Sequence, residues 1–436
     1  MQIFLTLGYL AIFIFLIRRS HFFRIDGLHD SLPSLLFFFK VLAGICLGLV
    51  YTYIYTDIKT TDTFKFFNDS KILYRSLFEH PYDFFRMFSG YHASDADLRH
   101  YYLEMDSWLN TNMFVNDNRT LIRLNALICV FTVGHYYANV VFMNFLSFTG
   151  LMCLFKLFAR ILKEEKKLLL LTTFFFPSLL FWGSGLLKDG LLIFGLGVFL
   201  YSFSKAMEND FRLKNILLLL LGFITLALTK IYVVSILIPL LLAWVISVKA
   251  KSKRPAPVFL ITSGILFLIA FNIYRIFPEV NLTAALYWKQ WNFYEYAKSM
   301  QSRSLIQIPK LDFTQLNLIK CALAGFFTTL LRPSLPDINS NPLQLLAIAE
   351  NLMLLAILAL PFVFPNRNRR EGKTLLVFSF FFTVFLFMLI GMITPVLGAI
   401  VRYKIPAFPF IGFIVLYYTN TKLLMGKLPF LKKYLS

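Results

Sequence analysis

The chain has 436 residues, of which 58% are hydrophobic and 18% aromatic, and its formal net charge is +20. A soluble globular protein has about 45–50% apolar residues, whereas the apolar residues here form blocks of the length that a membrane crossing needs. Basic residues cluster between these blocks, as in the loops of membrane proteins, which argues against a nucleic-acid partner. The sequence therefore predicts an all-α polytopic membrane protein.

The apolar blocks give about eleven candidate membrane spans. Arg18 and Arg19 follow the first block instead of preceding it, which is the reverse of a secretory signal peptide, so this block counts as a span. The blocks cover residues 2–17, 34–55, 133–158, 168–184, 187–204, 215–229, 231–248, 257–273, 343–364, 374–394 and 404–420.

Basic clusters predict the orientation of these spans, because cytoplasmic loops carry most of the Lys and Arg. The clusters lie at residues 18–24, 160–167, 249–254, 367–373 and 422–433. All of them can be cytoplasmic if the further block at 317–331 does not cross, so we expect that block to be a re-entrant or interfacial helix. The N-terminus then lies outside and the C-terminus inside.

Two large loops are expected on the extracytoplasmic side, a helical first loop at 57–120 and a second at 275–342. No soluble domain is appended, so residues 1–436 are expected to form a single membrane domain. The first loop is rich in Asp and Glu. Asp62 follows the second span at the membrane boundary, where partial desolvation suits a carboxylate to act as a general base. Asp69, seven residues later, would share its helix face. A solvated loop whose acids keep it outside the bilayer is the alternative interpretation.

The segment 176–190 is the most distinctive in the chain. Small residues at 183–185 interrupt the helix, and Lys188 and Asp189 open the next one. Ionisable residues at a span boundary are costly unless they are paired or face a polar cavity. A snorkelling lysine beside a helix-capping aspartate would be the structural explanation, but we favour a polar binding site.

Further cations lie at the outer ends of spans, where basic residues are unusual. They are Lys230, Arg275, Arg332, Arg402 and Lys404. Each alone is explained by lipid headgroups; together they predict a site for a lipid phosphate, which cations bind through charge-assisted contacts. Glu350 lies within an apolar span and must face protein or water, either as a structural partner of a cation or along a substrate path.

Two tryptophans, Trp288 and Trp291, lie in an aromatic and polar run within the second loop. Such runs usually form an interfacial belt. Flat aromatic faces next to amide and acid groups would also suit stacking on a sugar ring, so both tryptophans are candidate sugar contacts.

These features resemble the bacterial polytopic glycosyltransferases of the GT-C superfamily, which use sugars carried on polyprenyl phosphate. The resemblance rests on the acidic first loop, the outer cations, and the late segment 401–409, in which Arg402 and Lys404 precede two prolines. It implies a location in the bacterial cytoplasmic (inner) membrane with the active face extracytoplasmic. The implied partners are a polyprenyl-phosphate-linked sugar or oligosaccharide and membrane lipids.

In that superfamily a first-loop carboxylate acts as the general base or holds a metal ion. By position this role falls on Asp62, with Asp57 and Asp69 as rivals, and a divalent metal is left open as a cofactor. The favoured function is an inverting glycosyltransferase. Two alternatives stay open: a polysaccharide polymerase or ligase that depends on outer arginines, and a non-catalytic lipid-linked-glycan transporter or membrane scaffold.

Overall fold

The computed structural model describes residues 1–53, 61–108, 117–338, 342–366 and 371–427, and every regular element in these ranges is a helix. One candidate site residue, Asp57, lies outside the described residues. So do residues 367–370 and 428–436, which hold parts of two of the basic clusters.

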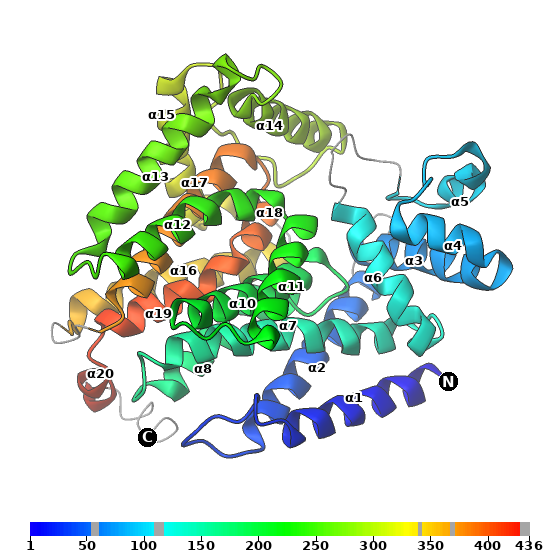
Figure 1. Ribbon diagram of the computed structural model, residues 1–436, viewed down its shortest axis with the longest axis horizontal. Helices are drawn as coiled ribbons and strands as arrows, with labels where there is room; N and C mark the ends of the chain where they lie inside the picture. The colour runs from blue at the N-terminus through cyan, green and yellow to red at the C-terminus, as the bar shows by residue number, and fades with distance from the viewer. Residues whose placement is uncertain (54–60, 109–116, 339–341, 367–370, 428–436) are drawn as a thin grey trace. The chain divides into compact units, whose positions relative to one another are not determined.

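The chain divides into two compact units, of which unit 1 consists of residues 1–154 and 179–231. The helices of unit 1 are α1 (Gln2–Arg19), α2 (Leu32–Tyr53), α3 (Asp62–Glu79), α4 (Pro81–Ser89), η2 (Ala96–Leu98), α5 (Arg99–Glu104), α6 (Asp117–Thr132), α7 (Tyr136–Ala159), α9 (Pro177–Trp182), α10 (Lys188–Met207) and α11 (Leu213–Thr229) (Figure 1). The last residues of α7 and the first of α9 belong to unit 2.

Unit 2 consists of residues 155–178 and 232–436. Its helices are α8 (Lys166–Phe174), α12 (Ile231–Lys249), α13 (Pro255–Asn272), η3 (Ile273–Arg275), α14 (Leu282–Ser299), α15 (Gln315–Leu331), η4 (Leu335–Asp337), α16 (Pro342–Val363), α17 (Lys373–Ile393), α18 (Leu397–Tyr403), η5 (Ile405–Ala407), α19 (Phe408–Tyr418) and α20 (Thr421–Lys427).

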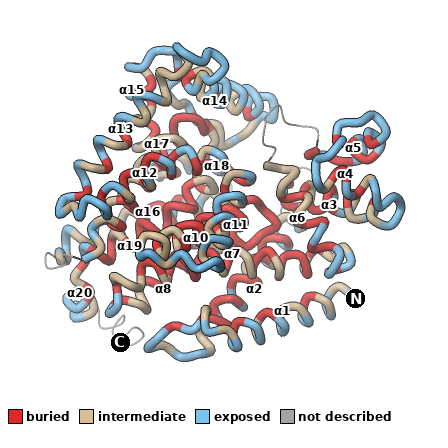
Figure 2. The backbone as a smooth tube through the Cα atoms, viewed as in Figure 1, coloured by how far each residue is buried: buried red, intermediate tan, exposed pale blue. Residues whose placement is uncertain are grey.

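Within the described residues, 9 helices are long and apolar enough to cross a membrane: α1, α2, α7, α10, α12, α13 with η3, α16, α17, and α18 with α19. They match nine of the predicted blocks, so the chain is an integral membrane protein. Side chains of α10 are buried along most of its length, whereas α13 is largely exposed, as expected of a lipid-facing helix (Figure 2).

The other two predicted spans differ from a long continuous helix. The block at 215–229 is α11, which is apolar but has only 17 residues. The block at 168–184 is broken, because α8 ends at Phe174 and α9 begins at Pro177. Proline lacks the N–H that would continue the helix and disfavours a helical residue before it.

Helices α2, α7, α10 and α11 of unit 1 pack closely through glycines. A methyl group on Gly197 of α10 would lie 2.0 Å from the carbonyl oxygen of Gly150 on α7. A methyl group on Gly222 of α11 would lie 2.6 Å from the backbone nitrogen of Phe199 on α10. Small residues of this kind let membrane helices approach each other closely, since van der Waals packing drives their association.

Beside these spans, α3 to α6 form a helical cap, comprising residues 61–108 and 117–132. Its core contains Phe66, Phe67, Trp108 and Leu121, and it continues onto Tyr136 at the start of α7. Thr63 and Tyr136 share a hydrogen bond of 2.8 Å between their hydroxyl groups. The cap is therefore packed against the end of α7 that carries Tyr136.

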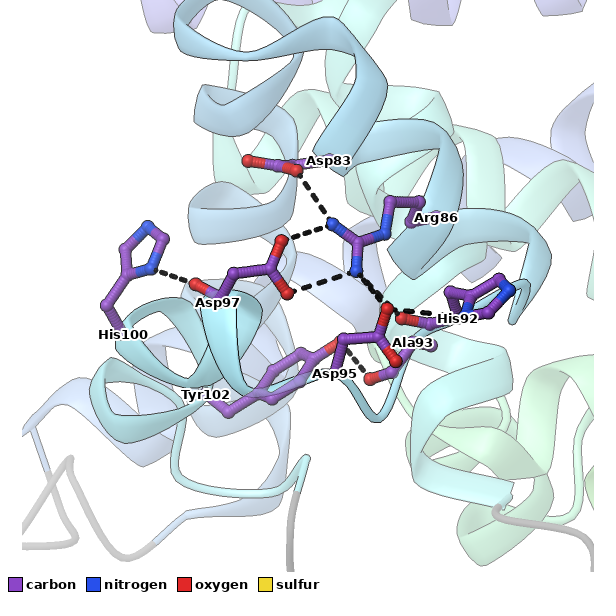
Figure 3. Close-up of polar contacts among 8 residues, drawn as sticks. All are labelled: Asp83, Arg86, His92, Ala93, Asp95, Asp97, His100 and Tyr102. Atoms are coloured by element: carbon purple, nitrogen blue, oxygen red, sulfur yellow. Dashed lines mark hydrogen bonds and ion pairs between the residues drawn. The ribbon is translucent and has the colours of Figure 1, made fainter.

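Acidic side chains of the cap surround one buried arginine, Arg86 (Figure 3). Its guanidinium donates to Asp95 at 2.7 Å, to both oxygens of Asp97, and to the carbonyl oxygen of His92 at 3.2 Å. Asp83, one turn before Arg86 on α4, is 3.4 Å away. Asp95 and Asp97 thus hold the segment 92–97 against α4, while Asp83 pairs with Arg86 within α4, so these three acids of the first loop have a structural role.

The two ends of unit 1 differ in charge. Arg18 and Arg19 end α1, and Arg24 lies in the turn that leads to α2. This turn lies by the C-terminal half of α10, where Phe22 contacts Tyr201. The helical cap lies at the other end, since it packs against the start of α7. One end is therefore basic, and the opposite end carries the acidic cap.

In unit 2, basic segments that are distant in the sequence lie at the same end of the helices. The end of α16 pairs with the end of α19, because the backbone of Asn366 donates to Tyr418 and that of Asn420 to Phe364. Lys422 pairs with Glu164 in the basic segment 160–167, and the Tyr417 hydroxyl donates to the backbone of Glu371. Described residues of three basic clusters therefore meet at one end.

Helices α15 and α17 of unit 2 pack antiparallel, with α15 against the C-terminal half of α17. Gly325 of α15 faces Gly391 of α17. A methyl group added to Gly325 would lie 2.6 Å from a backbone oxygen of α17. Leu318 packs with Met392 and Ile393, and Thr329, later on α15, donates to the earlier Phe387 carbonyl at 2.8 Å. The block at 317–331 is therefore a helix held against a membrane-spanning neighbour.

Candidate functional site

Three charged residues from distant parts of the sequence meet at the capped end of unit 1. The Lys188 ammonium lies 2.8 Å from Oδ1 of Asp117, and the Lys230 ammonium lies 3.3 Å from Oδ2 of the same carboxylate. Side-chain exposure is 10% for Lys188, 13% for Lys230 and 30% for Asp117. One carboxylate therefore bridges two largely buried ammonium groups, and we call these three residues the lysine bridge.

Asp62 belongs to the same site. It is exposed in the first turn of α3, and its charge acts on the Lys188 ammonium. Phe66, one turn later, places its ring centroid 5.2 Å from the Lys188 nitrogen, and Asn118 accepts a hydrogen bond from that nitrogen through Oδ1. The site thus contains two ammonium groups, an exposed carboxylate and an aromatic face.

The break between α9 and α10 fixes where Lys188 lies. Lys40, which is 1% exposed on α2, donates to the Gly183 carbonyl at 2.8 Å and to the Ser184 hydroxyl at 3.0 Å. From α7, Ser147 donates to the Gly183 carbonyl at 2.8 Å and Asn144 to the Ser184 carbonyl at 2.7 Å. Carbonyl groups that a helix break leaves without a partner need such donors inside a membrane. Four hydrogen bonds fix the break at residues 183–184, which lies just before Lys188 in the chain.

The charges of the lysine bridge support one another. Burial alone would raise the pKa of Asp117, but the ammonium groups of Lys230 and Lys188 outweigh burial and hold that pKa below its ordinary value. Asp117 is therefore ionised at neutral pH, and the bridge holds two positive charges around one negative charge.

Asp69, the rival base within the described residues, has a different setting from Asp62. It shares α3 with Asp62 but is only 1% exposed, and its two oxygens accept the backbone N–H groups of Asp106 at 2.9 Å and Ser107 at 2.8 Å. Burial raises the pKa of Asp69 to about 6, although the two backbone hydrogen bonds oppose the rise. Asp69 therefore anchors the turn at 106–107.

Unit 2 contains a second group of buried charges within its membrane helices. Lys404, 2% exposed, donates to Oδ1 of Asn351 at 2.7 Å and to the Arg332 carbonyl at 3.3 Å. Glu350, 6% exposed, accepts the backbone N–H of Ser178 at 3.1 Å and also its hydroxyl, and its charge acts on Lys404. Both ionisable groups are thus satisfied by protein partners.

The other predicted residues of unit 2 lie around this group or in the second loop. The Arg332 guanidinium pairs with Asp337 at 3.6 Å, and Arg402 is half-buried on α18. Arg275 is exposed at the end of η3, and Trp288 and Trp291 are exposed on α14, where Trp291 stacks on Tyr287. In unit 1, Asp189 is buried in the first turn of α10.

Asp117 and Lys40 are central to the site, but sequence reasoning did not single them out. Asp117 is one of many acids in the first loop, and the charge pattern carries no sign of its two lysine partners. Lys40 interrupts an apolar block, and an isolated lysine within a span is a signal of a polar partner. That signal could have identified Lys40, though not the break at 183–184 that it contacts.

A metal-binding carboxylate was one of the two roles expected in the first loop. Among the side chains that the structure describes, no three His, Cys, Asp or Glu groups gather as metal ligands. Asp117 lies between two ammonium groups, and the charge of Asp62 acts on one of them; ammonium groups repel a divalent cation. The lysine bridge is therefore suited to an anion.

Comparison of the chain with protein-family models, with curated proteins and with solved structures found no match in any of the three. The chemistry of the site is accordingly inferred from its own residues.

Proposed function

We propose that the protein is a membrane glycosyltransferase that moves a sugar from a polyprenyl-phosphate-linked donor to an acceptor at the extracytoplasmic face. The observation that carries this proposal is the meeting of Lys188, Lys230 and the exposed Asp62 at one end of unit 1. A phosphate needs cationic donors, and the acceptor hydroxyl needs a base. Both requirements are met within one site.

The orientation is part of the proposal. Cytoplasmic loops are rich in Lys and Arg, which assigns the basic end of unit 1 to the cytoplasm and its capped end to the outside. About eleven crossings follow if α11 spans and α8 and α9 together form an interrupted span. The lysine bridge then lies at the outer boundary of the bilayer, where a lipid-linked phosphate would arrive sideways.

The reaction that suits these residues is an inverting displacement. The two ammonium groups hold the donor phosphate, while Asp62 accepts the proton of the acceptor hydroxyl as its oxygen attacks the anomeric carbon. The new carbon–oxygen bond forms on the face opposite to the phosphate, and the bond to the phosphate oxygen breaks. Its electron pair leaves with the polyprenyl phosphate, which the lysines stabilise, so no acid has to protonate it.

The sequence predicted that cations of unit 2 also bind the lipid phosphate, but this proposal does not assign them that role. Lys404 is engaged with Asn351 and near Glu350, and the Arg332 guanidinium pairs with Asp337. Pairs of this kind stabilise membrane helices that contain ionisable groups. We assign the donor phosphate to Lys188 and Lys230, and a structural role to Glu350 and Lys404.

The test is sugar transfer by purified protein in proteoliposomes, supplied with radiolabelled polyprenyl-phosphate hexoses and extracted envelope glycans as acceptors. Asp62→Asn should lower the rate at least about hundredfold, which is the usual cost of losing a general base. Glu79→Gln is the matched control, since it removes another exposed acid of α3 that pairs with Arg75, and it should leave the rate unchanged. Wild-type transfer by Asp62→Asn would refute the proposal and favour an arginine-dependent polymerase or ligase.

A further inference from the structure

We propose that Asp117 is an internal competitor of the donor phosphate, occupying the phosphate position between Lys188 and Lys230 when the site is empty. This inference rests on the proposed function and adds a mode of regulation to it. Binding of the anion would displace the carboxylate, so that the lysines exchange one negative partner for another.

The geometry of the lysine bridge is that of a two-point anion site. Each oxygen of Asp117 contacts a different ammonium group, at 2.8 Å and 3.3 Å. Two oxygens of a phosphate group can make the same pair of contacts, and phosphate has a further oxygen and more negative charge. The bridge therefore already presents the arrangement that a phosphate would use.

Charge favours the exchange. Two ammonium groups share the Asp117 carboxylate, so the two lysines face the ligand with their positive charges when that carboxylate turns away, and the charge of Asp62 stays the same before and after the exchange. A phosphate ester with one or two negative charges compensates the two lysines at least as well as Asp117 does. Electrostatics alone therefore permits the ligand to replace the carboxylate.

Exposure also favours the exchange, because the displaced group has somewhere to go. The Asp117 side chain is 30% exposed, whereas those of Lys188 and Lys230 are only 10% and 13% exposed. A rotation of the Asp117 side chain would return its carboxylate to water, which solvates it at little cost. The lysines lack that freedom, and Asn118 and Phe66 hold Lys188 in place.

The arrangement has a use in a membrane. Two buried lysines without a counter-charge would destabilise the empty protein, because an unpaired buried charge is costly. Asp117 stabilises them until the donor arrives. Its presence also lowers the affinity for weak anions, so only a ligand with strong phosphate contacts replaces it.

The test measures binding of inorganic pyrophosphate to the full-length protein in detergent by isothermal titration calorimetry. Asp117→Asn removes the competing charge and should tighten binding roughly tenfold, the effect of about 1.4 kcal/mol. Asn118→Asp is the complementary variant, because it adds a carboxylate beside Lys188 in the same volume. It should weaken binding by a similar factor, and it remains informative if Asp117→Asn fails to fold.

Weaker binding by a folded Asp117→Asn protein would overturn the inference, since Asp117 would then be a fixed structural partner. Unchanged binding in both variants, or absence of binding in the wild type, would also overturn it. These outcomes are separate from failure of the proposed function. The readout is pyrophosphate binding and not sugar transfer, so Asp62→Asn could retain sugar transfer while the competition at Lys188 and Lys230 is observed.

Discussion

Carboxylates of the same cap have three different environments, and each implies a different role. Asp62 is exposed beside the Lys188 ammonium, Asp69 is buried under the turn at 106–107, and Asp97 is held by Arg86. Asp62 and Asp97 are both exposed, but Asp97 is hydrogen-bonded to the Arg86 guanidinium, whereas the cation near Asp62, Lys188, belongs to the lysine bridge. The choice of Asp62 as the base therefore depends on its environment and not on the acidity of the loop.

The pH dependence of stability should distinguish these carboxylates. Burial raises the pKa of Asp69 from 3.8 to about 6, so between these values the folded protein binds more protons than the unfolded chain. Stability then falls as pH rises through this window, by up to about 3 kcal/mol, and is level above it. Asp69→Asn should lack this fall, which thermal unfolding of both proteins in detergent at pH values from about 4 to about 7 would reveal.

Asp97→Asn is the control for that measurement. The Arg86 guanidinium holds the pKa of Asp97 below its ordinary value, so the stability that Asp97 contributes is lost only as pH falls below that ordinary value. This variant should keep the wild-type fall between about 4 and about 6. An Asp69→Asn protein with the same fall as the wild type would show that Asp69 does not titrate there.

At the scale of the elements, breaks between helices determine where the charged residues of the site lie. The break at 183–187 was predicted from its small residues, and α10 does begin at Lys188. The break at 175–176 was not predicted, because Pro177 lies inside a continuous apolar block and hydropathy does not respond to a missing N–H. The long helices could thus be predicted from the periodicity and length of the apolar blocks. The positions of the short, interrupted helices depend on tertiary partners such as Lys40, which the apolar pattern does not indicate.

Helix α15 offers a test of the predicted topology. The Arg332 carbonyl at its end lies with Lys404 and Asn351, near the middle of α16. A re-entrant α15 requires the chain after Arg332 to return to the outer side before α16 begins. Lys310→Cys and Ile338→Cys, at exposed positions before and after α15, should both react with a membrane-impermeant thiol reagent added outside intact cells.

The labelling needs an internal reference and a background without the exposed Cys46. Lys253→Cys lies in a basic cluster assigned to the cytoplasm and should react only after the cells are permeabilised. If Ile338→Cys behaves like Lys253→Cys, then α15 crosses the membrane and the predicted number of spans is wrong.

At the scale of the whole molecule, described residues of three basic clusters gather at one end of unit 2. The sequence predicted that these clusters share one side of the membrane, because basic clusters between apolar blocks indicate the side on which a loop lies. It also nominated Asp62, Lys188 and Lys230 individually. It could not pair them, since spans separate residue 188 from residues 62 and 117 and from residue 230, and the packing of these spans depends on glycine contacts such as Gly150 with Gly197.

The central claim is that Lys188 and Lys230 hold the phosphate of a polyprenyl-linked donor at the capped end of unit 1. Electron cryomicroscopy of the protein in lipid nanodiscs with added polyprenyl phosphate tests it most directly. The account predicts phosphate density about 3 Å from both ammonium nitrogens, the distance of a charge-assisted hydrogen bond. Phosphate density at Arg402 or elsewhere in unit 2, with the lysine bridge unchanged, would contradict it.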